Sequence, residues 1–224
     1  MDEIKNTKVS INVVPITDND KQVVMNSVTQ YFFRDEPLCA SLGLMEEKES
    51  VIQLENFCSD LLQCGVSFMA VSAETGEMMG ASLNTTLCRD DEIKKYGDEN
   101  NDKSSKFNEI MVFLDKAEQN IDIFGKYPNI DRIMELKIIT VNEAYRGQGV
   151  CKALINKSKK LALELGYQMI YVECSSHFTA KAVERFGFQC IYSLCYLDYR
   201  NKEDDVVFKT QFPHDYFKIH VLVL

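Results

Sequence analysis

The chain has 224 residues, of which 46% are hydrophobic, and a formal net charge of −9 at pH 7. This size is sufficient for one large buried core, and no Gly/Ser-rich linker marks a boundary, so we predict a single domain over residues 1–224. The acidic balance argues against a nucleic-acid partner, because a phosphate backbone requires a basic surface. It suits a cationic small molecule better.

The composition also bears on location and metal content. The N-terminal segment is charged and lacks the apolar core of a signal peptide, and no apolar run approaches the ~18 residues that cross a bilayer. We therefore expect a cytoplasmic protein that does not span a membrane. Its eight cysteines contain no C-x-x-C pair and are expected to be reduced thiols, while three histidines without ligand-like spacing predict no metal site.

Hydrophobic periodicity predicts the elements in chain order. A strand over residues 9–16 precedes a helix that starts near Asp20 and stops before Pro37. The next predicted elements are a helix over 48–62, strands over 66–72 and 78–84, a charged surface excursion over 89–105 and a helix over 107–118. The last are a strand over 134–141, a helix over 150–165, a strand over 168–174, a helix over 179–186 and strands over 188–198, 206–210 and 217–224. This mixture predicts an α/β fold with one mixed sheet of about seven strands and helices on both faces.

The turn between the strand over 134–141 and the helix over 150–165 is the most informative segment. Gly147 and Gly149 remove two side chains where the backbone bends, and the following helix points the positive end of its dipole at the same place. Bare amides beside a helix N-terminus bind a pyrophosphate well, so we expect an enzyme with a cofactor here. A dinucleotide fold is disfavoured, because the turn comes late and Lys152 replaces the third glycine of G-x-G-x-x-G.

The segment Arg146-Gly-Gln-Gly-Val-Cys151 resembles the Q/R-x-x-G-x-G/A motif of the GNAT acetyltransferases, although Cys151 replaces the usual Gly or Ala. Downstream, Glu184-Arg-Phe-Gly-Phe188 resembles the short helix ending in Gly-Phe of that superfamily. The resemblance implies a GNAT fold in which the turn binds the pyrophosphate of acetyl-CoA and the preceding strand binds the pantetheine arm. The cofactor-binding residues that it implies are Ile139, Thr140, Val141, Arg146, Gly147, Gln148, Gly149, Val150, Cys151, Lys152 and Ser176.

Three further segments resemble the insect arylalkylamine N-acetyltransferases: Arg34-Asp-Glu-Pro-Leu38, Cys174-Ser-Ser-His-Phe-Thr-Ala180, and the C-terminal segment that contains Pro213-His-Asp-Tyr. This resemblance implies an enzyme, commonly a monomer, that acetylates dopamine, serotonin, octopamine, tryptamine or related amines. It further implies Glu36 as general base and Ser175 and Thr179 as assisting hydroxyls. His177 and His214 are candidate substrate residues.

The chemistry of amine acetylation agrees with these roles. An alkylammonium must lose a proton before it attacks a thioester, and a carboxylate such as Glu36 can accept that proton. Backbone amides of the strand around residues 138–141 can stabilise the developing oxyanion. The superfamily position for a tyrosine proton donor is Val183 here, so Ser175 or Thr179 would protonate the leaving thiolate. With both substrates bound together, no acyl-enzyme is needed.

Several alternatives stay open at this level. Glu36 can be a surface carboxylate at a helix end, Ser175 and Thr179 can be N-caps, and the two histidines can be structural. Glu135 is the second candidate base, whereas Cys151 and Cys174 lack the paired base that a nucleophile needs. The acceptor can be a polyamine, agmatine or a protein amine, and the fold can also serve as a non-catalytic CoA-binding module.

Overall fold

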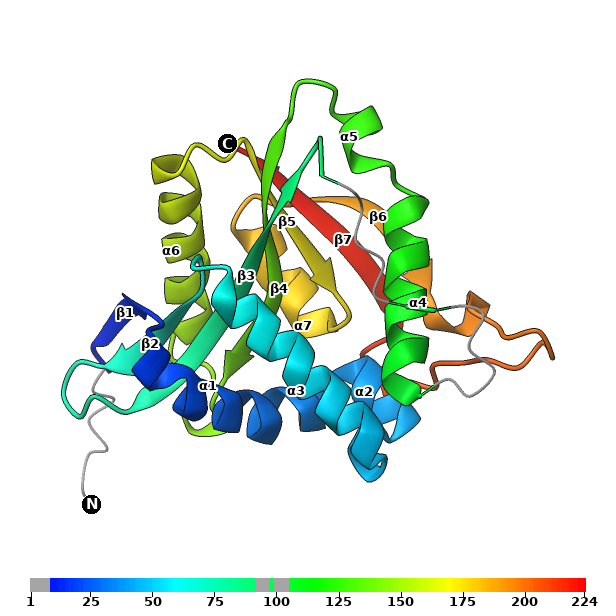
Figure 1. Cartoon of the computed structure of the whole chain (residues 1–224), viewed down its shortest axis with the longest axis horizontal. Helices are drawn as coiled ribbons and strands as arrows, with labels where there is room; N and C mark the ends of the chain where they lie inside the picture. Colours follow the sequence, from blue (N-terminus) through cyan, green and yellow to red (C-terminus); the bar gives the residue numbers. More distant parts are fainter. Residues whose placement is uncertain (1–8, 92–96, 99–104) are drawn as a thin grey trace, which may run out of the picture.

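The computed structural model describes residues 9–91, 97–98 and 105–224, so most of the predicted surface excursion lies outside the described residues (Figure 1). Seven strands form one sheet in the order β1-β2-β3-β4-β5-β7-β6. The strands are β1 (Ile11–Pro15), β2 (Phe68–Ser72), β3 (Met78–Cys88), β4 (Arg132–Val141), β5 (Met169–Cys174), β6 (Gln189–Cys195) and β7 (Tyr216–Val223). The predicted seven-stranded mixed sheet is therefore confirmed.

Neighbouring strands are antiparallel throughout, except for β4 and β5, which are parallel. The predicted strand over residues 206–210 is wrong, because Val206 forms only an isolated bridge with Arg200. Strand β3 runs on to Cys88, four residues beyond its predicted end, where it stays paired with the start of β4.

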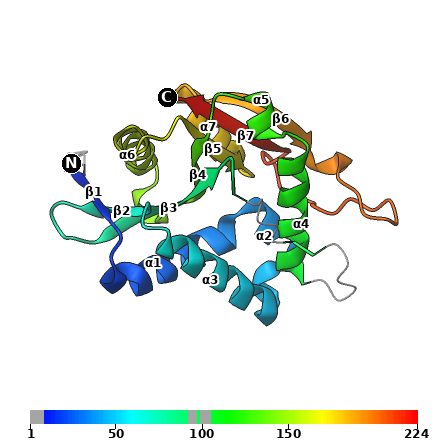
Figure 2. The same ribbon diagram turned by 45° about the horizontal axis from the view of Figure 1, so that its top comes forward.

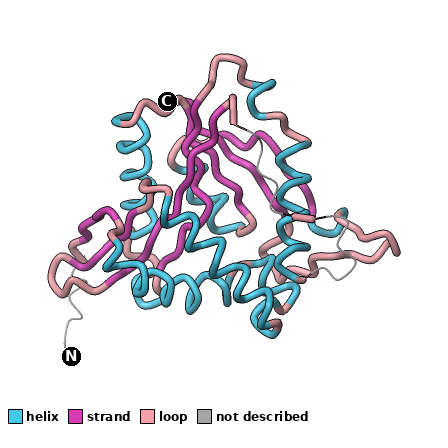
Figure 3. The backbone as a smooth tube through the Cα atoms, viewed as in Figure 1, coloured by secondary structure: helices cyan, strands magenta, loops and turns pink. Residues whose placement is uncertain are grey.

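Helices cover both faces of this sheet, as Figures 2 and 3 show. One face packs against α1 (Lys21–Ser27), α2 (Pro37–Leu42), α3 (Lys48–Gln63) and α4 (Lys106–Gln119), and the short α5 (Ile123–Lys126) follows α4. The other face packs against α6 (Val150–Glu164) and α7 (His177–Arg185). The cores on the two faces are separate, because alternate residues of β4 and β5 point to opposite sides. Within the described residues, no helix has both the length and the apolar character that a bilayer crossing requires.

The segment before Pro37 differs from the single predicted helix. It consists of α1, a π-helical stretch over Val28–Phe33, and then a new helix, α2, that begins at Pro37. Proline is favoured at the first position of a helix, because its missing N–H would have no intrahelical acceptor there. Glu36 is therefore the N-cap of α2.

The sheet opens between its two parallel strands. β4 pairs with β5 only from Ile133 to Leu136, whereas its pairing with β3 continues to Val141. Lys137 lies at the point of divergence and is the extra residue of a β-bulge, since Leu136 pairs with Asn84 and Ile138 with Leu83. Beyond this bulge the β5-facing edge of β4 has no strand partner in the described structure.

Candidate active site

The glycine turn has the geometry of an anion site. Gly147 and Gly149 have φ values of 76° and 92°, in the left-handed region that favours glycine. The first hydrogen bond of α6 runs from Ala153 N to Gly149 O, so the amides of residues 150–152 have no intrahelical acceptor. A Cβ built on either glycine meets nothing within 4 Å. This open turn, residues 146–152, fits a diphosphate and is called the phosphate turn below.

Ion pairs link the phosphate turn to the segment that carries Glu36. Asp35 accepts hydrogen bonds from Arg34 Nε and Arg146 Nη2, each at 2.6 Å, and Arg34 also reaches Glu143 at 3.0 Å. The hydrogen bond from Arg34, followed by that from Arg146, lowers the pKa of Asp35 to about 2. Two segments more than 100 residues apart thus meet beside the open edge of β4.

Glu36 is buried, with 8% of its surface exposed, and is not the surface carboxylate of the alternative reading. Its Oε2 accepts a hydrogen bond from Cys39 N at 2.6 Å, as an N-cap does. Its Oε1 is buried without a hydrogen-bond partner among the described residues. Burial, and then the charge of Glu36, raises the pKa of Cys39, so this neighbour is a neutral thiol.

Glu36 and Ser175 line the same narrow cavity, which has a volume of about 70 Å³. Its walls are mostly apolar and come from α3, α4, the π-helical stretch and the sheet. Three phenylalanines, Phe32, Phe57 and Phe107, are among the lining residues. Among the described residues that line this cavity, four are ionisable: Glu36, Cys39, Lys137 and Glu173.

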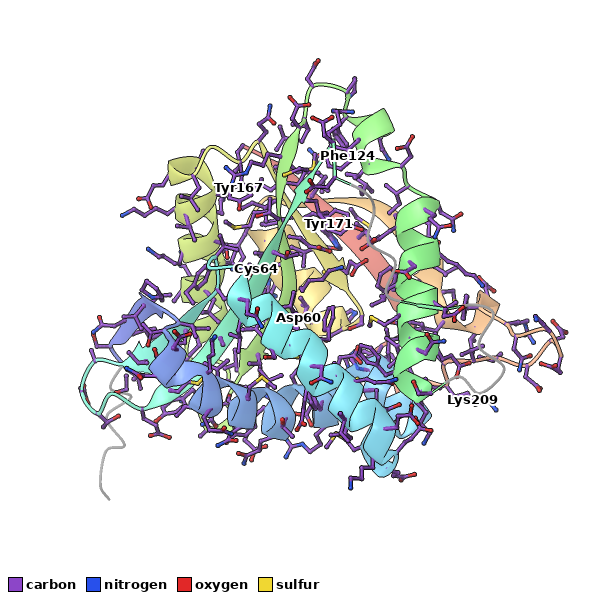
Figure 4. All side chains as sticks on the ribbon, viewed as in Figure 1. Asp60, Cys64, Phe124, Tyr167, Tyr171 and Lys209 are labelled. Atoms are coloured by element: carbon purple, nitrogen blue, oxygen red, sulfur yellow. The ribbon has the colours of Figure 1, made fainter. Side chains whose placement is uncertain are left out.

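A wider cavity of about 650 Å³ lies next to the narrow one and shares Phe57 and Lys137 with it. It lies between α3, β3, α4 and α5, over the start of β4 and β5. Figure 4 labels four of its lining residues: Asp60, Cys64, Phe124 and Tyr171. The two cavities therefore adjoin at the Phe57 and Lys137 side chains.

A carboxylate cluster, Glu118, Glu135 and Glu173 around Lys137, lies where the two cavities meet. Lys137 Nζ is 2.5 Å from Glu135, 3.1 Å from Glu118 and 3.3 Å from Glu173. Burial raises the pKa of Glu135 to about 7 and that of Glu173 well above its ordinary value, while Lys137 opposes both shifts. Three carboxyl groups share one ammonium, so the cluster has an excess of acid.

The predicted hydroxyl residues are separated by the structure. Ser176, not Ser175 or Thr179, is the N-cap of α7 and accepts a hydrogen bond from Phe178 N. The carbonyl of Ser175 accepts a hydrogen bond from the buried hydroxyl of Tyr196 at 2.9 Å. Thr179 lies in the first turn of α7 and is not among the residues that line the narrow cavity. Ser175 is therefore the better placed of the two hydroxyls.

The two candidate substrate histidines lie together, outside both cavities. His177 N donates to His214 Nδ1 at 3.2 Å, and the Phe178 ring packs between the two imidazoles. Burial, followed by the neighbouring His177, lowers the pKa of His214, which keeps it neutral at pH 7. His214 thus holds the backbone of His177, and it also lies within electrostatic range of Glu36. The substrate roles of the two histidines stay predictions.

The structure alters the roles expected for two glutamates. Glu135, the second candidate base, lines the wide cavity and not the narrow one. Glu173, which the sequence analysis did not single out, is the second carboxylate residue that lines the narrow cavity. The signal for it was a single acidic residue inside an otherwise apolar strand, MIYVEC. Burial raises the pKa of Cys151 to about 11, and that of Cys174 still higher, so neither is a ready nucleophile.

Comparisons with known proteins agree with this geometry. The model of the acetyltransferase (GNAT) family matches residues 112–188, which include β4, the phosphate turn and α7. The crystal structure of arylalkylamine N-acetyltransferase 2 from Aedes aegypti is 29% identical, with a TM-score of 0.88 and coverage of 96% of this chain and 99% of that one. The polyamine N-acetyltransferase of Drosophila melanogaster, which forms N-acetylagmatine, is 21% identical, with a TM-score of 0.81 and coverage of 96% and 100%. The second similarity supports the fold alone.

Proposed function

We propose that this chain is a GNAT acetyltransferase that transfers acetyl from acetyl-CoA to a small primary amine, and the fold and the match over residues 112–188 support this proposal. We further propose that the acceptor is an arylalkylamine such as dopamine, serotonin, octopamine or tryptamine, and that the enzyme acts as a single-domain monomer. The observation that carries the proposal is Glu36, which lines a narrow apolar cavity beside the open edge of β4 and whose buried Oε1 has no hydrogen-bond partner in the described part of the chain.

The phosphate turn and β4 would hold the acyl donor. The amides of residues 150–152 and the glycines at 147 and 149 would bind the diphosphate, with Arg146 and Lys152 as nearby positive charges. The β5-facing edge of Ile139–Val141 would pair with the pantetheine arm, because that edge has no strand partner in the described structure. Acetyl-CoA supplies an activated acetyl thioester, and the same edge offers backbone amides near it.

Glu36 is suited to remove the proton of the acceptor ammonium. Its Oε1 is free to accept a proton directly or through one water, while the bond from Cys39 N keeps the carboxylate in place. Ser175 is the hydroxyl within the same cavity that can donate to the departing thiolate. Tyr196 fixes the backbone at Ser175, and burial raises its pKa well above the ordinary value, so it stays a neutral donor.

Two observations support different acceptors. Phe32, Phe57 and Phe107 line the narrow cavity, and they favour an aromatic amine, in agreement with the name of the Aedes aegypti relative. The carboxylate cluster beyond Lys137 favours a polyamine or agmatine, because its excess acid suits a second cation. We place the arylalkylamine first, since the cluster already holds one ammonium of its own.

Incubation of the protein with acetyl-CoA and a panel of amines, with free thiol release as the readout, tests the proposal. The panel contains tryptamine, dopamine, spermidine and agmatine, and hydrolysis without amine is the blank. We expect the highest kcat/KM with tryptamine or dopamine. A higher kcat/KM with spermidine or agmatine would contradict the proposed acceptor and favour a polyamine or agmatine. Tight CoA binding without turnover would instead identify a non-catalytic module.

A further inference from the structure

Two residues that line the narrow cavity each have a buried carboxylate oxygen without a hydrogen-bond partner among the described residues. These oxygens are Oε1 of Glu36 and Oε1 of Glu173. The exposed fraction of Glu36 is 8%, and that of the Glu173 side chain is 7%. An unsatisfied carboxylate oxygen in an apolar setting is costly, so two such oxygens on residues that line one small cavity indicate a ligand that donates hydrogen bonds and carries positive charge.

The groups around Glu173 explain why its Oε1 has no hydrogen-bond donor among the described residues. Lys137 Nζ reaches Glu173 Oε2 at 3.3 Å, but it also reaches Glu118 and Glu135. The bulge at Lys137 brings Lys137 and Ile138 to the same cavity, although they are consecutive residues of a strand. One ammonium therefore serves three carboxylates, and Oε1 of Glu173 receives no donor among the described residues.

We propose that Glu173 Oε1 and Glu36 Oε1 together form the seat for the acceptor's ammonium group, with Glu173 as a binding residue and Glu36 as the base. The inference rests on the proposed function and extends it to a residue that the motifs do not mark. A primary ammonium has three N–H donors, enough for both oxygens and one more acceptor. The apolar walls suit the carbon skeleton of the acceptor next to its ammonium group. The far end of the acceptor would point towards Lys137 and Phe57, where the wide cavity begins.

Charge balance supports a cation here and not a neutral donor. Glu173 faces Lys137 and Glu135 from β4 and Glu118 from α4. Burial raises the pKa of Glu173 well above its ordinary value, and the like charges of Glu118 and Glu135 add to the effect, so the empty seat favours the protonated carboxyl group more than water does. An incoming ammonium favours the carboxylate, so binding would displace a proton to solvent in the pH range where this group titrates. Binding of the amine should therefore release protons.

The test compares Glu173→Gln with Glu109→Gln, a matched loss of one half-buried carboxylate on α4 that lines neither cavity. With tryptamine and acetyl-CoA, we expect Glu173→Gln to raise KM roughly 10- to 100-fold, as for loss of a hydrogen bond to a charged group, with a smaller effect on kcat. Glu109→Gln should keep KM within about threefold. Equal changes of KM in both variants, or an unchanged KM in Glu173→Gln, would contradict the proposed ammonium seat.

Calorimetry provides a second test, and its first arm uses only the wild-type protein. Tryptamine is titrated into the wild-type protein saturated with CoA at several pH values between 5 and 9, in two buffers of different ionisation enthalpy at each pH. We expect net proton release on binding, and its loss in folded Glu173→Gln; binding without proton release overturns the inference. Binding without turnover in the thiol assay retains the seat and rejects the proposed function, whereas absence of any amine binding rejects both.

Discussion

The substitution Gly149→Glu tests the phosphate turn. Gly149 has φ = 92°, and a Cβ there meets nothing within 4 Å, so the folded chain has room for the side chain. The left-handed backbone costs a non-glycine residue ~1–2 kcal/mol, which for a chain of this length lowers the melting temperature by ~2–8 °C. At ~5 Å and an effective dielectric constant of ~20, a new carboxylate repels each diphosphate charge by about 3 kcal/mol. We therefore expect the Kd for CoA to rise by more than about 100-fold.

Gly166→Glu is the matched control for this variant. Gly166 has φ = 73°, also with nothing within 4 Å of a Cβ, and it follows the opposite end of α6. The two variants should lose similar stability by thermal melting, while only Gly149→Glu loses CoA affinity by calorimetry. Folded Gly149→Glu with unaltered CoA affinity would refute the reasoning about the turn.

Three further predictions concern the carboxylates. Glu36→Gln should lower kcat by about 10²–10⁴, the range for loss of a general base. Its amide keeps an oxygen that can accept the hydrogen bond from Cys39 N, so the fold and the CoA affinity should change little. Turnover within a few-fold of wild type would show that Glu36 is not the base. The pKa of Asp35 is lowered from 3.8 to about 2, so its ion pairs stabilise the fold above pH 3.8 and are lost as the pH falls through about 2. At pH 6 we expect Asp35→Asn to melt at a lower temperature than wild type, with a loss of less than ~1 kcal/mol of stability because the ion pair is partly exposed. The two melting temperatures should converge near pH 2, and a difference that persists there contradicts the account. The pKa of Glu135 is raised from 4.5 to about 7, so its stabilising contribution is complete below pH 4.5 and is lost as the pH rises through about 7. Chemical denaturation should show the wild type losing more stability than Glu135→Gln between these values, and parallel profiles would contradict this.

Local patterns were enough to predict the phosphate turn and most of the elements. The two glycines, the apolar strand before them and the amphipathic helix after them lie within one continuous segment, so sequence order alone places the amides beside the helix N-terminus. The sheet class followed from the same periodicity. The start of α2 at Pro37 was missed, because proline both ends one helix and begins another.

The acceptor side of the site depends on long-range register and was not accessible in the same way. Glu173 and Glu36 lie far apart in sequence but line one cavity, and the bulge brings the consecutive residues Lys137 and Ile138 to the same cavity. Pairing across strands far apart in sequence decides which residues meet on one side of the sheet. Glu135 was proposed as the second base because it lies near the site in the sequence, but its side chain lines the wide cavity.

A crystal structure of the protein grown with CoA is the most direct test of the central claim. The account predicts diphosphate density against the amides of Gly147, Gly149 and residues 150–152 and a pantetheine arm along Ile139–Val141, with its sulfur beside Glu36 and Ser175. Density for the diphosphate at any other part of the chain would contradict it.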